Sequence, residues 1–133
     1  MAKSKATKAK EVTEQTKRIV LERQGYRSIS GATLKLGATE FHHVRPRSSS
    51  GVGYEWNIVA LTSEEHRLLH DKKKIKYYDR DRWEYEEFET LIRNHLKINY
   101  PNWSYKACKY EKGYEVKDYG IVGKFRSNYK TIE

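Results

Sequence analysis

The sequence has a single cysteine, two prolines and no long apolar run among its 133 residues. One cysteine, Cys108, excludes an intrachain disulfide and every zinc site built from CxxC pairs. No segment approaches the ~20 consecutive apolar residues of a membrane-spanning helix, and no signal-peptide run follows the basic start. We therefore expect a cytoplasmic protein with no membrane partner.

Acidic residues are outnumbered, since 27 Lys and Arg against 18 Asp and Glu give a formal net charge of +9. Such an excess favours a polyanionic partner, most often nucleic acid. The length corresponds to one small domain, whose core leaves little room for a deep dinucleotide pocket. Composition alone does not distinguish a nucleic-acid-binding protein from an enzyme.

The chain is expected to begin with a flexible basic arm over residues 1–10, which contain four lysines, and to form a single domain over residues 11–133. Apolar periodicity and turn residues predict a definite order of elements. These are a helix over 11–24, a short strand or irregular hairpin over 26–36, strands over 39–44 and 55–61 around a loop over 45–54, a helix over 62–71, a basic connector over 72–78, and a helix over 82–98. The rest of the C-terminal extension over 72–133 is expected to be irregular, with one helical turn near 105–110.

Four of the five histidines fall within 29 residues. His66 and His70 are four positions apart on a predicted helix, which places both imidazoles on one helix face. His42 and His43 are adjacent on the strand that feeds this helix through the hairpin. Either pair alone is more often accidental than functional, but the order of the whole set, with Asn57 between the pairs, is specific.

The segment over residues 40–70 resembles an HNH endonuclease motif, whose three letters match His43, Asn57 and His66. A weaker similarity to phage-type HNH proteins extends back to about position 18. The resemblance implies an α+β fold with a small ββα-metal (His-Me finger) core over residues 39–71 and flanking helices. It also implies a bacterial host cell or a phage as the source.

Many HNH proteins brace the motif with two CxxC pairs and a structural zinc. The matching stretches here, residues 28–31 and 62–65, hold no cysteine. We therefore expect no structural zinc and a brace made by hydrophobic packing. The candidate bracing residues are Phe41, Val44, Trp56, Ile58, Leu61 and Leu68.

The resemblance implies that His42, His66 and His70 bind one divalent metal ion. Members of the family often use Mg²⁺ or Mn²⁺ in the cell, and imidazole ligands also suit Ni²⁺ or Zn²⁺. Glu40 shares a strand face with His42. It is expected either to support that ligand as a hydrogen-bonded carboxylate or to be a solvated strand residue.

The resemblance further implies that His43 is the general base, which activates the water that attacks DNA and leaves 5′-phosphate and 3′-hydroxyl ends. Asn57 is expected to tie the hairpin loop together and orient His43. His95 lies among the periodic apolar positions of the helix predicted over 82–98, and it is interpreted as a packed histidine outside the site. Cys108 is expected to be inert.

Basic side chains near the motif are candidates for nucleic-acid contacts. Arg45 and Arg47 leave the first strand beside the base, and we expect them to contact phosphates. The lysine run after the motif helix is expected either to contact the DNA backbone or to form a solvated face. Its members are Lys72, Lys73, Lys74 and Lys76.

Two other functions stay open from the sequence: a non-catalytic, metal-stabilised DNA-binding module, and a ribonuclease. The oligomeric state is also open, since a monomer with one site is expected to nick DNA and a homodimer to cut both strands. Phage packaging proteins are candidate partners beside DNA itself.

Overall fold

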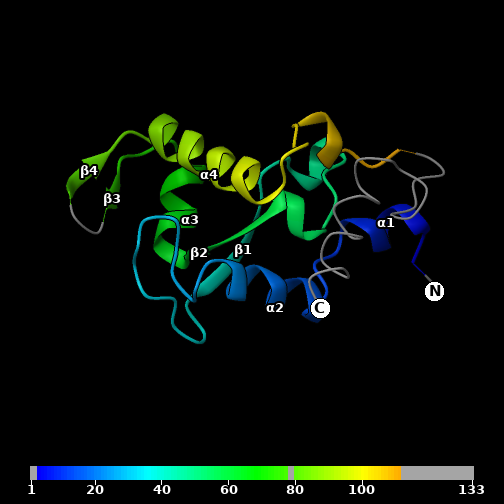
Figure 1. Cartoon of the computed structure of the whole chain (residues 1–133), viewed down its shortest axis with the longest axis horizontal. Helices are drawn as coiled ribbons and strands as arrows, with labels where there is room; N and C mark the ends of the chain where they lie inside the picture. The colour runs from blue at the N-terminus through cyan, green and yellow to red at the C-terminus, as the bar shows by residue number, and fades with distance from the viewer. Residues whose placement is uncertain (1–2, 78–79, 112–133) are drawn as a thin grey trace.

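An antiparallel hairpin of β1 (Thr39–His43) and β2 (Ile58–Thr62) forms the centre of the molecule (Figure 1). The structure, a computed structural model, describes residues 3–77 and 80–111, so the predictions for residues 1–2, 78–79 and 112–133 lie outside it. The other elements are α1 (Lys5–Lys10), α2 (Glu14–Arg23), α3 (Ser63–His70), α4 (Tyr85–Asn99), and a second hairpin of β3 (Ile75–Tyr77) and β4 (Arg80–Trp83). The fold is α+β, as predicted.

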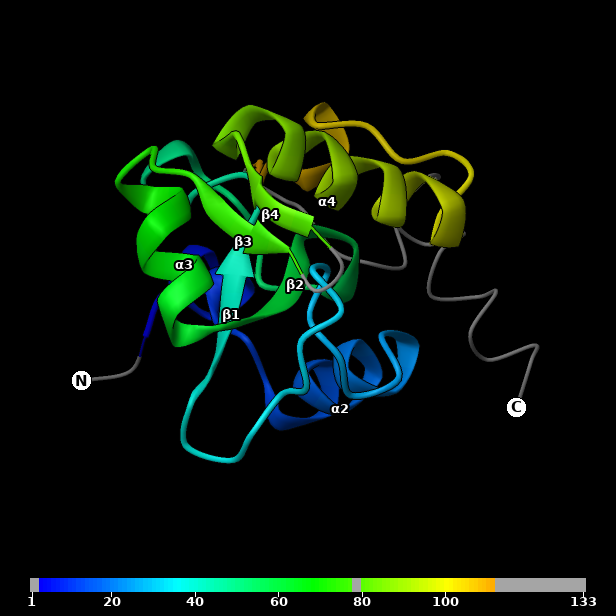
Figure 2. The same ribbon diagram turned by 90° about the vertical axis from the view of Figure 1, so that its left-hand side faces the viewer.

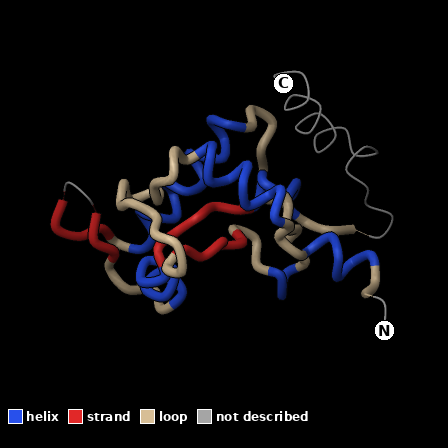
Figure 3. The backbone as a smooth tube through the Cα atoms, turned by 90° about the horizontal axis from the view of Figure 1, so that it is seen from below, coloured by secondary structure: helices blue, strands red, loops and turns tan. Residues whose placement is uncertain are grey.

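Strand β2 is buried along most of its length and divides the core into two parts. Ile58, Val59, Ala60 and Leu61 are all 0% exposed. Val59 and Leu61 belong to the larger cluster, which includes the apolar face of α4, whereas Ile58 and Ala60 pack with Val20 of α2. Both faces of the hairpin are therefore covered by helices, as Figure 3 shows with the two strands between them.

Helix α2 is bonded to the outer edge of β2 through its last side chains. The Arg23 guanidinium donates to the carbonyl oxygens of Glu55 and Ile58, both at 2.7 Å. The side-chain amide of Gln24 donates to Ala60 O at 2.9 Å and accepts from Ala60 N at 2.8 Å. These bonds satisfy backbone groups that the two-stranded sheet leaves unpaired.

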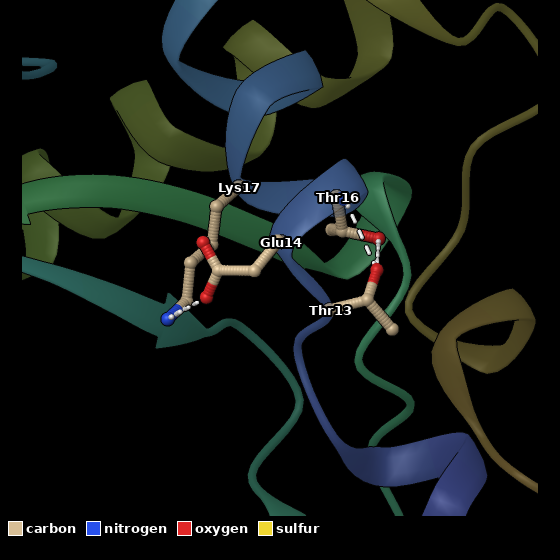
Figure 4. Close-up of polar contacts among 4 residues, drawn as sticks. All are labelled: Thr13, Glu14, Thr16 and Lys17. Carbon is tan, nitrogen blue, oxygen red and sulfur yellow. Dashed lines mark hydrogen bonds and ion pairs between the residues drawn. The ribbon is translucent and has the colours of Figure 1, made fainter.

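Helix α2 begins at Glu14 rather than at position 11, because Thr13 caps it by accepting a bond from Thr16 N at 3.1 Å (Figure 4). The predicted arm over residues 1–10 is wrong for the part described: Lys5–Lys10 form α1, capped by Ser4, and Ala9 is 8% exposed.

Two further predictions are corrected by short elements. Glu55–Asn57 form a 3₁₀ turn, so β2 begins at Ile58. Residues predicted as a connector and as the start of the last helix instead pair as β3 and β4, so α4 begins at Tyr85. Segment 26–36 contains one isolated bridge, between Arg27 and Thr33, which fits the predicted irregular hairpin.

The predicted packing positions are confirmed. Trp56, Ile58 and Leu61 are fully buried, and the side chains of Phe41, Val44 and Leu68 are half-buried against the two clusters. On α4, Phe88, Ile92 and Leu96 face the core. The chain then returns through Trp103, whose Nε1 donates to Trp56 O at 2.6 Å, to a 3₁₀ turn at Lys106–Cys108.

The two cysteine-free stretches, residues 28–31 and 62–65, are joined by the buried carboxylate of Glu65 as well as by hydrophobic packing. Thr62 and Glu65 form a capping box at the start of α3, and Glu65 Oε1 accepts from Thr62 N at 3.0 Å. The same carboxylate accepts from the hydroxyls of Ser28 and Ser30, which are 5% and 1% exposed. Hydrogen bonds thus connect the loop before β1 to α3 through the two cysteine-free stretches, residues 28–31 and 62–65.

We predict that Glu65→Ala lowers the free energy of unfolding by about 3 kcal/mol, because it removes charge-assisted bonds and leaves two buried hydroxyls unpaired. Urea denaturation followed by circular dichroism measures the change. The neighbouring Glu64 is exposed, so Glu64→Ala is expected to change stability by less than about 0.5 kcal/mol. Equal stability of the two variants would show that the hydrogen bonds of Glu65 do not stabilise the fold.

Candidate functional site

His42 and His66 come together between β1 and α3. Their ring centroids are 5.1 Å apart and the rings meet edge to face, at 69°. The register pairs His42 with Val59, whose side chain belongs to the larger cluster, so His42 lies on the α3 side of the hairpin. Burial, with smaller contributions from His66 and His43, lowers the pKa of His42 to about 3. Its imidazole is therefore neutral at cellular pH, with a lone pair on one nitrogen.

Glu40 supports this pair, but through the other histidine. It lies two residues before His42 and thus on the same face of β1. Its Oε1 is 2.7 Å from His66 Nδ1. The sequence leaves open either support of His42 or a solvated strand position, and the bond to His66 is neither of these. Hydrogen bonds from His66 and Ser63 hold the pKa of Glu40 below its ordinary value. Because the carboxylate engages Nδ1, the Nε2 atom of His66 is the nitrogen oriented for another ligand.

His70 is not brought to the other two predicted ligands. Its side chain is 86% exposed and its Nδ1 lies 3.4 Å from Asp71 Oδ1. Within residues 3–77 and 80–111, no group of three or more His, Cys, Asp or Glu side chains is arranged to hold a metal ion. Two members of the predicted ligand set are therefore adjacent, and the third is apart.

His43 lies on the opposite face of β1, as strand alternation requires. Its Nε2 is 2.9 Å from the carbonyl oxygen of Lys10, and since a carbonyl only accepts, Nε2 carries the proton. Burial lowers the pKa of His43; the bond to Lys10 opposes this, and the charges of Arg47 and His66 add to the lowering. The neutral ring therefore has its lone pair on Nδ1.

The carbonyl that holds His43 belongs to an element that the sequence did not assign to the site. The end of α1 docks on the hairpin loop, where Gly53 N donates to Ala9 O at 2.8 Å. A Cβ at Gly53 would lie 2.1 Å from the carbonyl oxygen of Glu11, so only glycine permits this approach. In the sequence, only Gly53 indicates that another backbone segment approaches this loop, and a glycine does not reveal which segment it is.

Asn57 ties the two ends of the hairpin loop, as predicted. It is fully buried, its Oδ1 accepts from Arg45 N at 2.7 Å, and its Nδ2 donates to Arg45 O at 3.0 Å and Val52 O at 2.7 Å. Its role is structural, because all of these bonds are to the backbone of the loop that follows His43.

The two predicted phosphate-binding arginines differ. The guanidinium of Arg45 stacks on Tyr105, 4.8 Å from the ring centroid, and donates to Ser49 O at 2.9 Å and Tyr105 O at 3.4 Å. Arg45 is thus engaged in holding the loop, which argues against the predicted phosphate contact. Arg47 is exposed, and its charge acts on His43.

The predicted lysine run follows α3 on the surface. Lys72, Lys73, Lys74 and Lys76 are all exposed. Lys74 Nζ is 3.4 Å from Glu84, and this exposed pair contributes little to stability.

The remaining two predictions for single residues are confirmed. His95 is a satisfied histidine: its Nε2 accepts from Arg23 Nε at 2.9 Å, and burial beside that guanidinium lowers its pKa to about 4. Burial raises the pKa of Cys108 to about 12, so its thiol stays protonated and unreactive.

Comparison with protein-family models, curated proteins and solved structures found no match to this chain. In the described part of the chain, every helix is too short or too polar to cross a membrane.

We predict that the His42 imidazole shows no titration step between about pH 5 and about pH 8, whereas an unperturbed histidine titrates near ~6.5. Nuclear magnetic resonance of the ring protons measures this. His66→Ala is expected to raise the pKa of His42, because it removes a neighbouring charge and exposes the ring, while His70→Ala leaves it unchanged. A His42 midpoint near 6.5 would contradict the packing described here.

Proposed function

We propose that the chain is a metal-dependent endonuclease of the HNH class, in which β1, β2 and α3 form a ββα-metal core that hydrolyses DNA phosphodiester bonds. One observation carries the proposal. A pair of imidazoles, His42 and His66, is supported by a carboxylate on one face of β1, and the next residue, His43, has its tautomer set by a backbone carbonyl.

The side chains fit a divalent ion by their donor chemistry. His42 is neutral because of burial, and His66 has its Nδ1 on Glu40, the arrangement that orients an imidazole toward a metal through Nε2. In this proposal His42 and His66 hold the ion, and His70, one helical turn beyond His66, is an additional donor. A bound ion supplies charge stabilisation at the phosphoryl oxygens and the leaving 3′-oxygen.

His43 acts as the general base. Its Nδ1 takes a proton from a water molecule, and the hydroxide so formed attacks phosphorus opposite the 3′-oxygen. The Nε2–H remains on the Lys10 carbonyl, which stabilises the imidazolium that results. The P–O3′ bond breaks, and the leaving 3′-oxygen takes a proton from solvent water, which gives a 5′-phosphate and a 3′-hydroxyl end; His43 then releases its proton to solvent. Arg47, exposed and beside His43, contacts a phosphate near the scissile bond.

DNA is favoured as the substrate by the net charge of +9 and by the exposed lysines that follow α3. The catalytic histidine also argues for an enzyme over a binding module, because a structural ion needs no fourth histidine next to its ligands. In this proposal the protein works in the cytoplasm of a bacterial host, as a phage-type nuclease. One site per chain means that a monomer nicks and that two copies are needed to cut both strands.

We predict that His43→Ala lowers the rate of supercoiled plasmid nicking by about 100-fold or more, because it removes the general base. His43→Gln, whose side-chain amide nitrogen reaches the position of Nε2 and so retains a donor for the Lys10 carbonyl, is expected to lose the same activity. The assay uses Mg²⁺, Mn²⁺, Ni²⁺ or Zn²⁺, with Glu64→Ala as the control variant on the adjacent helix.

The outcome separates the three functions. Wild-type protein that binds plasmid and never nicks it with any of the four ions would support a binding module and overturn the nuclease. Faster cleavage of labelled RNA than of DNA would assign a ribonuclease. Unchanged nicking by His43→Ala would remove His43 from the role of base.

We predict that Glu40→Gln weakens Mn²⁺ or Ni²⁺ binding by about 10- to 100-fold, because the amide orients His66 less firmly than the carboxylate does. Isothermal titration calorimetry measures the dissociation constant, with Glu64→Gln as the control. His66→Ala is expected to weaken binding more than His70→Ala, since His70 lies apart from the pair. Equal ion binding by wild type and His66→Ala would rule out this site.

A further inference from the structure

A groove of about 510 Å³ lies between α2 and the segment that leads into β1. Leu21, Leu34 and Phe41 contribute its apolar walls, and the last of these is a residue of β1. The segment that leads into β1 runs beside α2, as Figure 2 shows. The groove is on the side of the hairpin that faces α2, away from the His42–His66 pair.

Two large apolar side chains lie exposed on this groove. Tyr26 is 55% exposed and Leu36 is 105% exposed; among the described residues, the third large exposed apolar side chain is Ile98, on α4. Tyr26 also has a φ of 60°, a left-handed conformation unfavourable for a tyrosine. Gly37, with a φ of 82°, allows the turn that leaves Leu36 at the surface.

The groove is basic as well as apolar. Lys17, Arg18 and Lys35 line it, with Glu14 as the one acidic side chain among its lining residues. Lys17 Nζ is 3.2 Å from Glu14 and 5.5 Å from the centroid of the Phe41 ring, so this cation lies between helix α2 and strand β1 (Figure 4). Arg18 and Lys35 are exposed. Apolar side chains among cations are typical of surfaces that meet both phosphates and base or sugar edges.

The groove leads toward the proposed base. Phe41 and His43 are two residues apart on β1 and therefore on the same face of the strand, about 7 Å apart along it. Beyond His43 lies Arg47, whose charge already acts on that histidine. A polyanion that follows this face of β1 would meet the groove cations first and the proposed catalytic residue next.

We propose that this groove binds the DNA duplex next to the cleavage point, with Arg18, Lys35 and Lys17 on phosphates and Leu36 and Tyr26 against the minor groove. The inference rests on the proposed function for the identity of the ligand as DNA and for the position of the cleavage point. Apolar side chains that project from a loop flanked by cations are suited to insertion at a minor-groove base step. The groove thereby supplies affinity and duplex positioning that the histidine site lacks.

The test measures binding separately from cleavage. Fluorescence anisotropy of a labelled duplex is recorded in EDTA, where no metal-dependent cleavage occurs, at several salt concentrations. Leu36→Ser is expected to raise the dissociation constant about 10-fold with an unchanged salt slope. Arg18→Ala is expected to lower the magnitude of the slope by about 1, as for loss of one phosphate contact.

The chain offers matched controls on α4. Ile98→Ser removes another large exposed apolar side chain (80% exposed), and Lys97→Ala removes an exposed cation; both variants are expected to bind as wild type does. Metal-dependent hydrolysis of bis(4-nitrophenyl) phosphate, too small to reach the groove, is expected to be equal in Leu36→Ser and wild type.

The two proposals fail in different ways. Wild-type duplex binding by both Leu36→Ser and Arg18→Ala would overturn the groove while leaving the nuclease intact. Weakened binding by these variants in a protein that never cleaves would support the groove and overturn the nuclease. Absence of wild-type duplex binding at low salt would overturn the groove as a DNA contact.

Discussion

The register of β1 on β2 is the constraint on which the rest of the structure depends. Pairing His43 with Ile58 and His42 with Val59 sends adjacent histidines to opposite faces of one short strand. It also buries both faces of β2, which supplies apolar residues to two clusters at once. A slip of one residue would exchange the two histidines and expose the core face of the strand, so burial of β2 and placement of the histidines are enforced by the same pairing.

Several polar side chains hold this hairpin in place from different directions. Arg23 and Gln24 satisfy the outer edge of β2, Asn57 closes the loop between the strands, and Glu65 joins α3 to the segment before β1. Each of these is buried or half-buried and bonded to the backbone or to buried hydroxyls. A chain with one cysteine thus braces a small motif with hydrogen bonds, where a zinc ribbon would need four thiolates.

Local pattern predicted the hairpin, the start of α3 and the packing positions of α4, because these depend on periodicity and capping within a few residues. Asn57 was predicted to tie the loop and does so. The pairing of Glu40 with His66, rather than His42, depends on how α3 lies against β1 and has no signature in spacing.

Contacts between residues far apart in the sequence also have no signature in local spacing. The carbonyl oxygen of Lys10 bonds His43, 33 positions later, and Arg45 donates to the carbonyl oxygen of Tyr105, 60 positions later. The sequence pattern does not indicate the short helix α1, because its lysines, alanines and threonine give almost no apolar periodicity. What the sequence predicted of the site was the composition of the histidine set; which members meet was decided by tertiary packing.

The proposed reaction is hydrolysis of DNA at this histidine arrangement, with breakage of the P–O3′ bond. The most direct measurement is incubation of supercoiled plasmid with wild-type protein and Mn²⁺ or Mg²⁺, followed by treatment of the nicked product with DNA ligase. Ligase joins only a 5′-phosphate to a 3′-hydroxyl, so breakage of the P–O3′ bond predicts nicks that are sealed directly. Nicks that resist sealing, or a plasmid that stays supercoiled with every divalent ion, would contradict it.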